Sequence, residues 1–112
     1  MNQSAEYLKG LFGMDGEVAV VIGGSGELGG ALAAGLGQVG AHAVIADIGD
    51  EPCKQRVEKL KSIGIKASYC VTDITDRSSL RQLLAESLKI TGKVDMLVNC
   101  AGINVEIGRA HV

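Results

Sequence analysis

The 112-residue chain has very few aromatic side chains: one Phe, two Tyr and no Trp. Proteins bind single-stranded nucleic acid partly by stacking bases on aromatic rings, so the composition excludes a stacking platform of that kind. No sign of charge dominates either. The formal net charge is -2, which leaves no basic surface to attract nucleic acid or an anionic membrane. We therefore expect neither nucleic acid nor a membrane as a partner.

Cysteine is scarce as well, and Cys53, Cys70 and Cys100 form an odd set without C-x-x-C spacing. That pattern predicts reduced thiols in a cytoplasmic protein and excludes a disulfide framework or a zinc site. Residues 1–17 contain the charged residues Glu6, Lys9, Asp15 and Glu17 and no long apolar run. We therefore expect no signal peptide or membrane anchor in this stretch.

Glycine, by contrast, is abundant, with 16 residues, and it is concentrated after the apolar run 18–22. A short uninterrupted apolar run predicts a strand buried on both faces. Residues 24–29 then match G-x-G-x-x-G, and residues 31–34 resume as good helix formers. Strand, glycine turn and helix form the layout that holds a dinucleotide, because the bare backbone and the helix N-terminus can approach a pyrophosphate.

The rest of the chain repeats this alternation. We predict a doubly wound parallel sheet of the Rossmann type, an α/β fold, that is truncated after its fourth strand and has the strand order 3-2-1-4. The strands are expected at residues 18–22, 43–46, 66–71 and 95–98. The helices are expected at 26–39, at 51–63, and from a cap at Thr75 or Asp76 to Gly92.

Hydrophobic spacing predicts which side of each helix faces the sheet. In the first helix the small residues Gly29, Gly30, Ala33 and Gly37 are expected to allow a close approach. Its inner stripe is predicted as Leu28, Leu32, Leu36 and Val39, that of the second helix as Cys53, Val57, Leu60 and Ile63, and that of the third as Leu80, Leu83, Leu84 and Leu88. The charges of the second helix (Lys54, Arg56, Glu58, Lys59 and Lys61) are expected to face water. Residues 1–16 form a lead-in whose Leu11, Phe12 and Met14 could pack beneath the first strand.

Acidic residues follow two of the predicted strands. Asp47 ends the second strand at the distance from the glycine turn that is typical of a ribose 2′-hydroxyl ligand. A carboxylate there accepts hydrogen bonds from the hydroxyl and repels a 2′-phosphate, which favours NAD over NADP. Asp50 is expected to cap the second helix. Asp73 has no evident structural task and lies just past the third strand, where ligands bind in open α/β sheets.

These motifs, together with Leu97-Val98-Asn99-Cys100-Ala101-Gly102, resemble the short-chain dehydrogenase/reductase family. The resemblance implies that the backbone of 23–28 lines the pyrophosphate, that Asp47 selects NAD, that Asp73 and Ile74 hold the adenine, and that 99–102 lies against the ribose. The cofactor-binding residues it implies are Gly23, Ser25, Gly26, Glu27, Leu28, Gly29, Asp47, Asp73, Ile74, Asn99, Ala101 and Gly102. The run 22–30 is most similar to members that act on sugar acids, such as D-mannonate oxidoreductases.

The chain departs from the family pattern at Ile22, which stands for a Thr, at Glu27, which stands for a Gly, and at Cys100, which stands for an Asn. We expect Glu27 to point outward, away from a pyrophosphate, and Cys100 to be a small buried filler. Gly23-x-x-Gly26-x-x-Gly29 also fits the family's extended branch, so an epimerase or dehydratase with bound NAD is one alternative, against which residues 99–102 argue. A non-catalytic NAD-sensing module is another.

The catalytic Ser and the Tyr-x-x-x-Lys motif of the family have no counterpart here, since neither Tyr7 nor Tyr69 is followed by Lys four residues on. We therefore assign no catalytic residue. The chain is interpreted as the cofactor half, residues 17–105, of a cytoplasmic, NAD-dependent, homo-oligomeric oxidoreductase that acts on a small molecule. Residues 106–112 can be encoded by GAG ATC GGA AGA GCA CAC GTC, which contains a common sequencing-adapter start, and are interpreted as a non-native tail.

Overall fold

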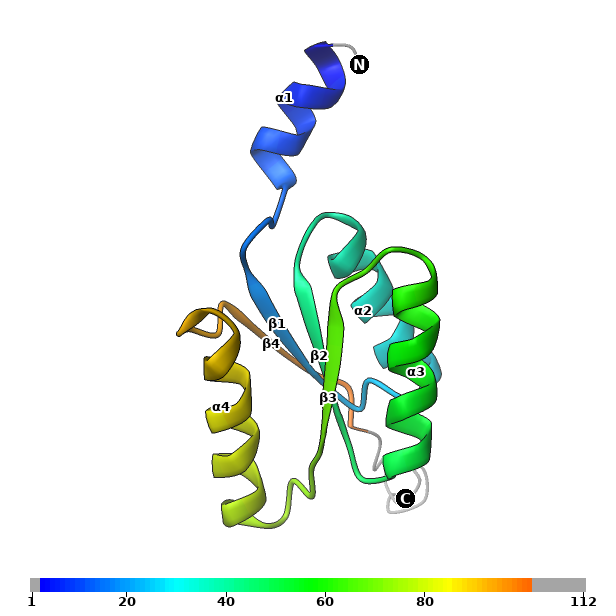
Figure 1. Ribbon diagram of the computed structural model, residues 1–112, viewed down its shortest axis with the longest axis vertical. Helices are drawn as coiled ribbons and strands as arrows, with labels where there is room; N and C mark the ends of the chain where they lie inside the picture. The colour runs from blue at the N-terminus through cyan, green and yellow to red at the C-terminus, as the bar shows by residue number, and fades with distance from the viewer. Residues whose placement is uncertain (1–2, 102–112) are drawn as a thin grey trace, which may run out of the picture.

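Four parallel strands in the order β3-β2-β1-β4 form the centre of the computed structural model, which describes residues 3–101 (Figure 1). The chain runs through α1 (Gln3–Phe12), β1 (Val18–Ile22), α2 (Glu27–Gln38), β2 (His42–Asp47), α3 (Asp50–Ser62), β3 (Ala67–Val71), α4 (Arg77–Thr91) and β4 (Met96–Asn99). The predicted element order and strand order are confirmed. Gly102 and the predicted tail 106–112 lie outside the described residues.

The strand β1 lies at the middle of the sheet and is buried at every position. Its Val20 is opposite Val44 of β2 on one side and Leu97 of β4 on the other. Helices α2 and α3 cover one face of the sheet and α4 covers the other (Figure 1). A strand with neighbours on both sides and helices on both faces must be apolar throughout, which explains the uninterrupted run in the sequence.

Because all four strands are parallel, their carboxyl ends lie at the same edge of the sheet. That edge brings together the glycine turn after β1, Asp47 at the end of β2, Thr72 after β3 and Cys100 after β4. Two backbone hydrogen bonds tie it together: Gly23 N–H donates to Ala46 O at 2.7 Å and Cys100 N–H donates to Ile22 O at 2.7 Å. The sheet therefore places the predicted site residues side by side.

The predicted inner stripe of α2 is wrong. Leu28 is 66% exposed, and Leu32 and Val39 are also exposed, whereas the buried residues are Gly29, Gly30 and Ala33. The helix passes so close to the strand ends that a Cβ at Gly29 would lie 2.7 Å from the carbonyl carbon of Gly23. Only the small-residue side fits against the sheet, so the leucines turn away from it.

The helix α4 also differs from its prediction, although its Leu80 and Leu84 line a groove against the sheet and do not turn away from it. Leu83 is buried as expected, but Leu80, Leu84 and Leu88 are exposed. The second buried residue of the helix is Ser87, whose hydroxyl donates to Leu83 O at 2.7 Å. A serine can face the sheet because this hydrogen bond satisfies its hydroxyl without any other partner.

Helix ends and the chain start also differ in part from expectation. Asp76 caps α4 by accepting from Ser78 N–H at 2.9 Å, and Gly92 ends that helix in the left-handed region, both as predicted. Gly49, and not Asp50, is the N-cap of α3. Ile63 follows α3 as its C-cap and is exposed, while Cys53, Val57 and Leu60 are buried as predicted.

Residues 3–12 form a helix that projects from the sheet, so Leu11 and Phe12 are exposed and do not pack beneath β1 (Figure 1). No helix within residues 3–101 combines the length and apolar character that crossing a membrane requires.

Candidate cofactor site

The turn between β1 and α2 is built from backbone that side chains would obstruct. Gly23 adopts a φ of 81°, and a Cβ on it would lie 2.6 Å from the carbonyl group of Cys100. Gly24 is equally confined, because a Cβ there would lie 2.9 Å from the side chain of Ile45. Only glycine fits these positions, so the turn packs tightly against the ends of β2 and β4.

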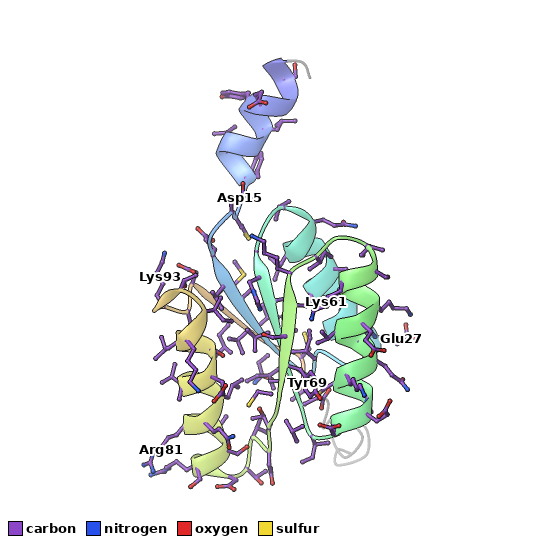
Figure 2. The ribbon with its side chains drawn as sticks, viewed as in Figure 1. Asp15, Glu27, Lys61, Tyr69, Arg81 and Lys93 are labelled. Carbon is purple, nitrogen blue, oxygen red and sulfur yellow. The ribbon has the colours of Figure 1, made fainter. Side chains whose placement is uncertain are left out.

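The first turn of α2 faces that backbone. Gly26 is its N-cap and supplies no side chain to bond the N–H groups that follow. Helix geometry leaves these first N–H groups without intrahelical acceptors, and the positive end of the helix dipole lies beside them. Glu27 is exposed and points away from the sheet, as expected (Figure 2).

The side chain of Asp47 accepts three hydrogen bonds, two of them from this turn. Its Oδ2 accepts from the Ser25 hydroxyl at 2.5 Å and from Ser25 N–H at 3.3 Å. Its Oδ1 accepts from Ile48 N–H at 2.9 Å. The end of β2 is thereby joined to the glycine turn over 22 positions of sequence. A carboxylate held in this way has one fixed orientation.

A cavity of about 230 Å³ adjoins Asp47. It brings together four of the predicted site residues: Asp47, Asp73, Ile74 and Ala101. The remaining lining residues are Ile22, Ile48, Thr72 and Thr75. Asn99 lies at its β4 side, where its Oδ1 accepts from Ala101 N–H at 3.1 Å and so fixes the chain after the strand.

Asp73 has a structural task that the sequence did not suggest. Its Oδ1 accepts from Thr75 N–H at 2.9 Å and from the Thr75 hydroxyl at 2.6 Å, which closes a local turn. These two bonds favour the charged form and lower the pKa of Asp73 below its usual value. The backbone of Asp73 is held as well, because its N–H donates a hydrogen bond to the Ser79 hydroxyl at 2.9 Å.

Two residues of the site were not anticipated. Thr72 is buried, and its N–H donates to Asp47 O at 2.7 Å while its hydroxyl donates to Cys70 O at 2.9 Å. Its position directly after a strand and before Asp73 was the available signal. Arg56 was predicted to face water, yet its Nη2 donates to Ser25 O and to Gly26 O, both at 3.2 Å.

The three cysteines are free thiols, as predicted. Burial, and secondarily the charge of Asp47, raises the pKa of Cys53 to about 11, so the thiol stays protonated and unreactive. Cys70 is buried too, whereas Cys100 is only half-buried. Within residues 3–101 no group of three or more His, Cys, Asp or Glu side chains is arranged to hold a metal ion.

Comparison with known proteins agrees with this geometry. The family model described as short chain dehydrogenase matches residues 17–111. The chain belongs to the short-chain dehydrogenase family. Its parallel sheet with the order 3-2-1-4 is therefore a truncated Rossmann-type fold, as in that family.

Three relatives illustrate the range of the family. The chain is 33% identical to 7alpha-hydroxysteroid dehydrogenase of Escherichia coli K12 over 80% of its own length and 35% of the relative's. It is 36% identical to 5-keto-D-gluconate 5-reductase of the same organism, over 83% of the chain and 37% of the relative. The structure matches F189W actinorhodin polyketide ketoreductase with NADPH at a TM-score of 0.75 and 30% identity, covering 77% of this chain and 33% of that one.

These relatives are all dehydrogenases or reductases, which does not favour the epimerase, dehydratase or sensor alternatives. The chain spans about a third of the length of each. Their named substrates differ widely, so membership of the family identifies the reaction class of the relatives and leaves the substrate of this protein to be proposed.

Proposed function

We propose that residues 17–105 form the NAD-binding half of an oxidoreductase. The reaction would move hydride between a nicotinamide and the hydroxyl or carbonyl carbon of a small molecule, and hydride transfer is the chemistry that the bound cofactor would supply. The observation that carries the proposal is the glycine turn joined to Asp47 through Ser25. The glycine turn fits a pyrophosphate because it leads into the N-terminus of α2, where backbone N–H groups without intrahelical acceptors can bind an anion.

The cavity beside Asp47 suits the adenosine part. Asp47 would accept from the ribose 2′-hydroxyl, Asp73 and Ile74 would lie beside the adenine, and Asn99, Ala101 and Gly102 would line the ribose. Gly23, Ser25, Gly26, Glu27, Leu28 and Gly29 would line the pyrophosphate with backbone groups. The same carboxylate would repel a 2′-phosphate, which favours NAD although a relative of known structure carries NADPH.

The experiment measures the binding of ADP-ribose and of its 2′-phosphate by calorimetry, because both ligands lack the nicotinamide and test the described half alone. We expect ADP-ribose to bind more tightly. In Asp47→Ala the preference should narrow, with a loss of about 1.5–3 kcal/mol for ADP-ribose from the missing carboxylate–hydroxyl bond. The ratio of the two affinities is diagnostic, since the loss of the Ser25 contact would weaken the binding of both ligands equally.

Glu58→Ala is the matched control, because it removes an exposed acidic side chain of α3 outside the site. Its ligand preference should equal that of the wild type. If the wild type binds the 2′-phosphorylated ligand as tightly as ADP-ribose, the role proposed for Asp47 is wrong.

The substrate and the complete enzyme belong to the same proposal. The resemblance of 22–30 to sugar-acid oxidoreductases and the relationship to a ketogluconate reductase support a sugar acid as substrate. The catalytic Ser, Tyr and Lys would lie in a longer parent protein, and residues 106–112 would be absent from it. Sequencing the gene tests this proposal, because a Tyr-x-x-x-Lys motif downstream of residue 105 is expected and its absence would argue against an enzyme.

A further inference from the structure

A side chain of α3, that of Arg56, also reaches the glycine turn. Arg56 Nη2 donates to the carbonyl oxygens of Ser25 and Gly26, both at 3.2 Å, across 31 and 30 positions of sequence. No other side chain among residues 3–101 donates a hydrogen bond to these two carbonyl groups. The guanidinium thus connects α3 to the turn that precedes α2.

Gly30 provides the room for this contact. A Cβ on Gly30 would lie 2.6 Å from Nη2 and 2.7 Å from Nε of Arg56, so the guanidinium rests directly on the backbone of α2. Nε itself is buried without a hydrogen-bond partner among the described residues. An unpaired buried N–H is unfavourable, and the two carbonyl bonds must outweigh that cost to hold the side chain here.

The orientation of these two carbonyl groups sets the direction of the N–H groups that share their peptide planes. A trans peptide is planar, so its N–H points opposite to its C=O. Holding Ser25 C=O therefore fixes the N–H of Gly26, which donates to Gly23 O at 3.1 Å. The Gly26 C=O accepts from Gly30 N–H at 2.8 Å as well as from Arg56, and the two bonds together fix the N–H of Glu27, the first residue of α2.

Ser25 is consequently held at all its polar groups. Asp47 accepts from its N–H and its hydroxyl, and Arg56 donates to its carbonyl. The turn is fixed from β2 on one side and from α3 on the other before any ligand arrives. Preorganised N–H groups bind an anion better than mobile ones, because the cost of ordering them is already met in the folded protein.

We propose that Arg56 is a positioning residue for the cofactor site: it orients the Gly26 and Glu27 peptides so that the N-terminus of α2 receives a pyrophosphate. The inference rests on the proposed dinucleotide function and deepens it. Arg56 acts through backbone geometry, and Gly30 is its required partner.

The test measures binding of ADP-ribose by calorimetry and of adenosine by NMR titration to the 112-residue chain and its variants. Arg56→Met and Gly30→Ala should each weaken ADP-ribose about 10-fold, the order expected for losing a charged hydrogen bond, and leave adenosine unchanged. Arg56→Lys should not restore the affinity, because the lysine side chain ends one atom short of the Nη2 position and lacks the flat guanidinium that rests on Gly30. The double variant Arg56→Met/Gly30→Ala should match Arg56→Met alone.

Lys59→Met is the control, since it removes a neighbouring positive charge of α3 that donates to neither carbonyl, and its affinity for ADP-ribose should stay within about 2-fold of the wild type. Circular dichroism verifies that each variant is folded. If Arg56→Met unfolds, the ADP-ribose affinity of Arg56→Lys still tests the positioning role of Arg56.

Full ADP-ribose affinity in Arg56→Lys, or an equal loss in Lys59→Met, would mean that charge alone matters and would overturn the inference. An equal loss for adenosine and ADP-ribose would also overturn it, because positioning acts on the pyrophosphate part. A wild-type chain that binds adenosine and ADP-ribose equally, or neither, would overturn the proposed function itself and this inference with it.

Discussion

Gly29 lies where α2 crosses the end of β1, and the adjacent backbone leaves no space for a side chain. A Cβ there would lie 2.7 Å from the carbonyl carbon of Gly23 and 2.9 Å from the Cα of Gly24. Both neighbours are backbone atoms, which cannot swing aside as the end of a long side chain can. Gly35, in the same helix, has nothing within 4 Å of an added Cβ.

We expect Gly29→Ala to lower the free energy of unfolding by about 1–3 kcal/mol, as overpacking does elsewhere. Gly35→Ala should instead raise it by up to about 1 kcal/mol, because alanine has the higher helix propensity and the site is open. Urea denaturation followed by circular dichroism gives both values. A Gly29→Ala protein as stable as the wild type would show that α2 can shift away from the turn.

Arg56 illustrates at the same scale why the type of a residue is a poor guide to its role. It belongs to a run of charged residues that reads as a solvated helix face, and its neighbours Lys54 and Lys59 are indeed exposed. Its long side chain nevertheless lies back over α2, where Gly30 leaves a path to the turn. The distinguishing feature is the partner glycine, which is 26 positions away.

At the scale of the elements, β2 and β3 are joined by a side-chain pair besides their backbone ladder. His42 Nε2 lies 2.9 Å from the Ser68 hydroxyl oxygen. Burial, and then the charges of Lys66 and Lys61, lowers the pKa of His42 below its usual value of 6.5. The folded protein therefore holds this histidine neutral over a range in which the unfolded chain protonates it.

The consequence is a loss of stability as the pH falls below 6.5. The unfolded state then binds a proton that the folded state binds only at lower pH, so acidification favours unfolding until the folded pKa is passed. We expect the free energy of unfolding to decrease through this window in the wild type and to change less in His42→Gln. Denaturation at a series of pH values measures the difference.

Asp73 and Asp95 do not obscure that comparison. Hydrogen bonds from Thr75 lower the pKa of Asp73, and those from Lys93 and Val18 lower that of Asp95, each from 3.8. Their contribution to stability is present above that value and is lost as the pH falls through the lower folded pKa. The role given to His42 would be contradicted if the free energy of unfolding changed equally in the wild type and in His42→Gln between pH 6.5 and the pH range in which the carboxylates titrate.

Several large apolar side chains are exposed on the surface of the molecule. An apolar groove of about 180 Å³ runs between α4 and β4, and its lining includes Leu80, Leu84 and Leu97. Leu97 is 62% exposed and lies on β4, one of the two outer strands of the described sheet. An exposed strand edge beside apolar side chains favours pairing with another chain.

We expect the 112-residue chain to self-associate as its concentration rises, and Leu84→Lys combined with Leu97→Lys to shift it toward the monomer. Ile63→Lys is the control, because Ile63 is an exposed apolar residue at the end of α3, outside this groove. Sedimentation velocity over a concentration series distinguishes the variants. A wild-type chain that stays monomeric throughout would show that the described sheet is self-sufficient.

The order of the elements was predictable from the sequence because it depends on local chemistry. Strands buried on both faces require continuous apolar runs such as 18–22, and turns with left-handed backbone require glycine at positions such as Gly23 and Gly92. Strands that alternate with helices can form only a few right-handed topologies, and 3-2-1-4 is one of them. Asp47 and Asp73 were predicted from their places at strand ends, whereas Ile74 and Ala101 were predicted from the resemblance to the family.

The tertiary structure decided which helix faces are buried and which side chains meet. Helix α2 offers two candidate faces, one of leucines and one of glycine and alanine, and periodicity cannot choose between them. The short distance between α2 and the sheet determines which face is buried, because a leucine side chain does not fit between them. The bonds from Ser25 to Asp47 and from Arg56 to the turn join residues 22 and 31 positions apart, so they exist only once the strands and helices have packed together.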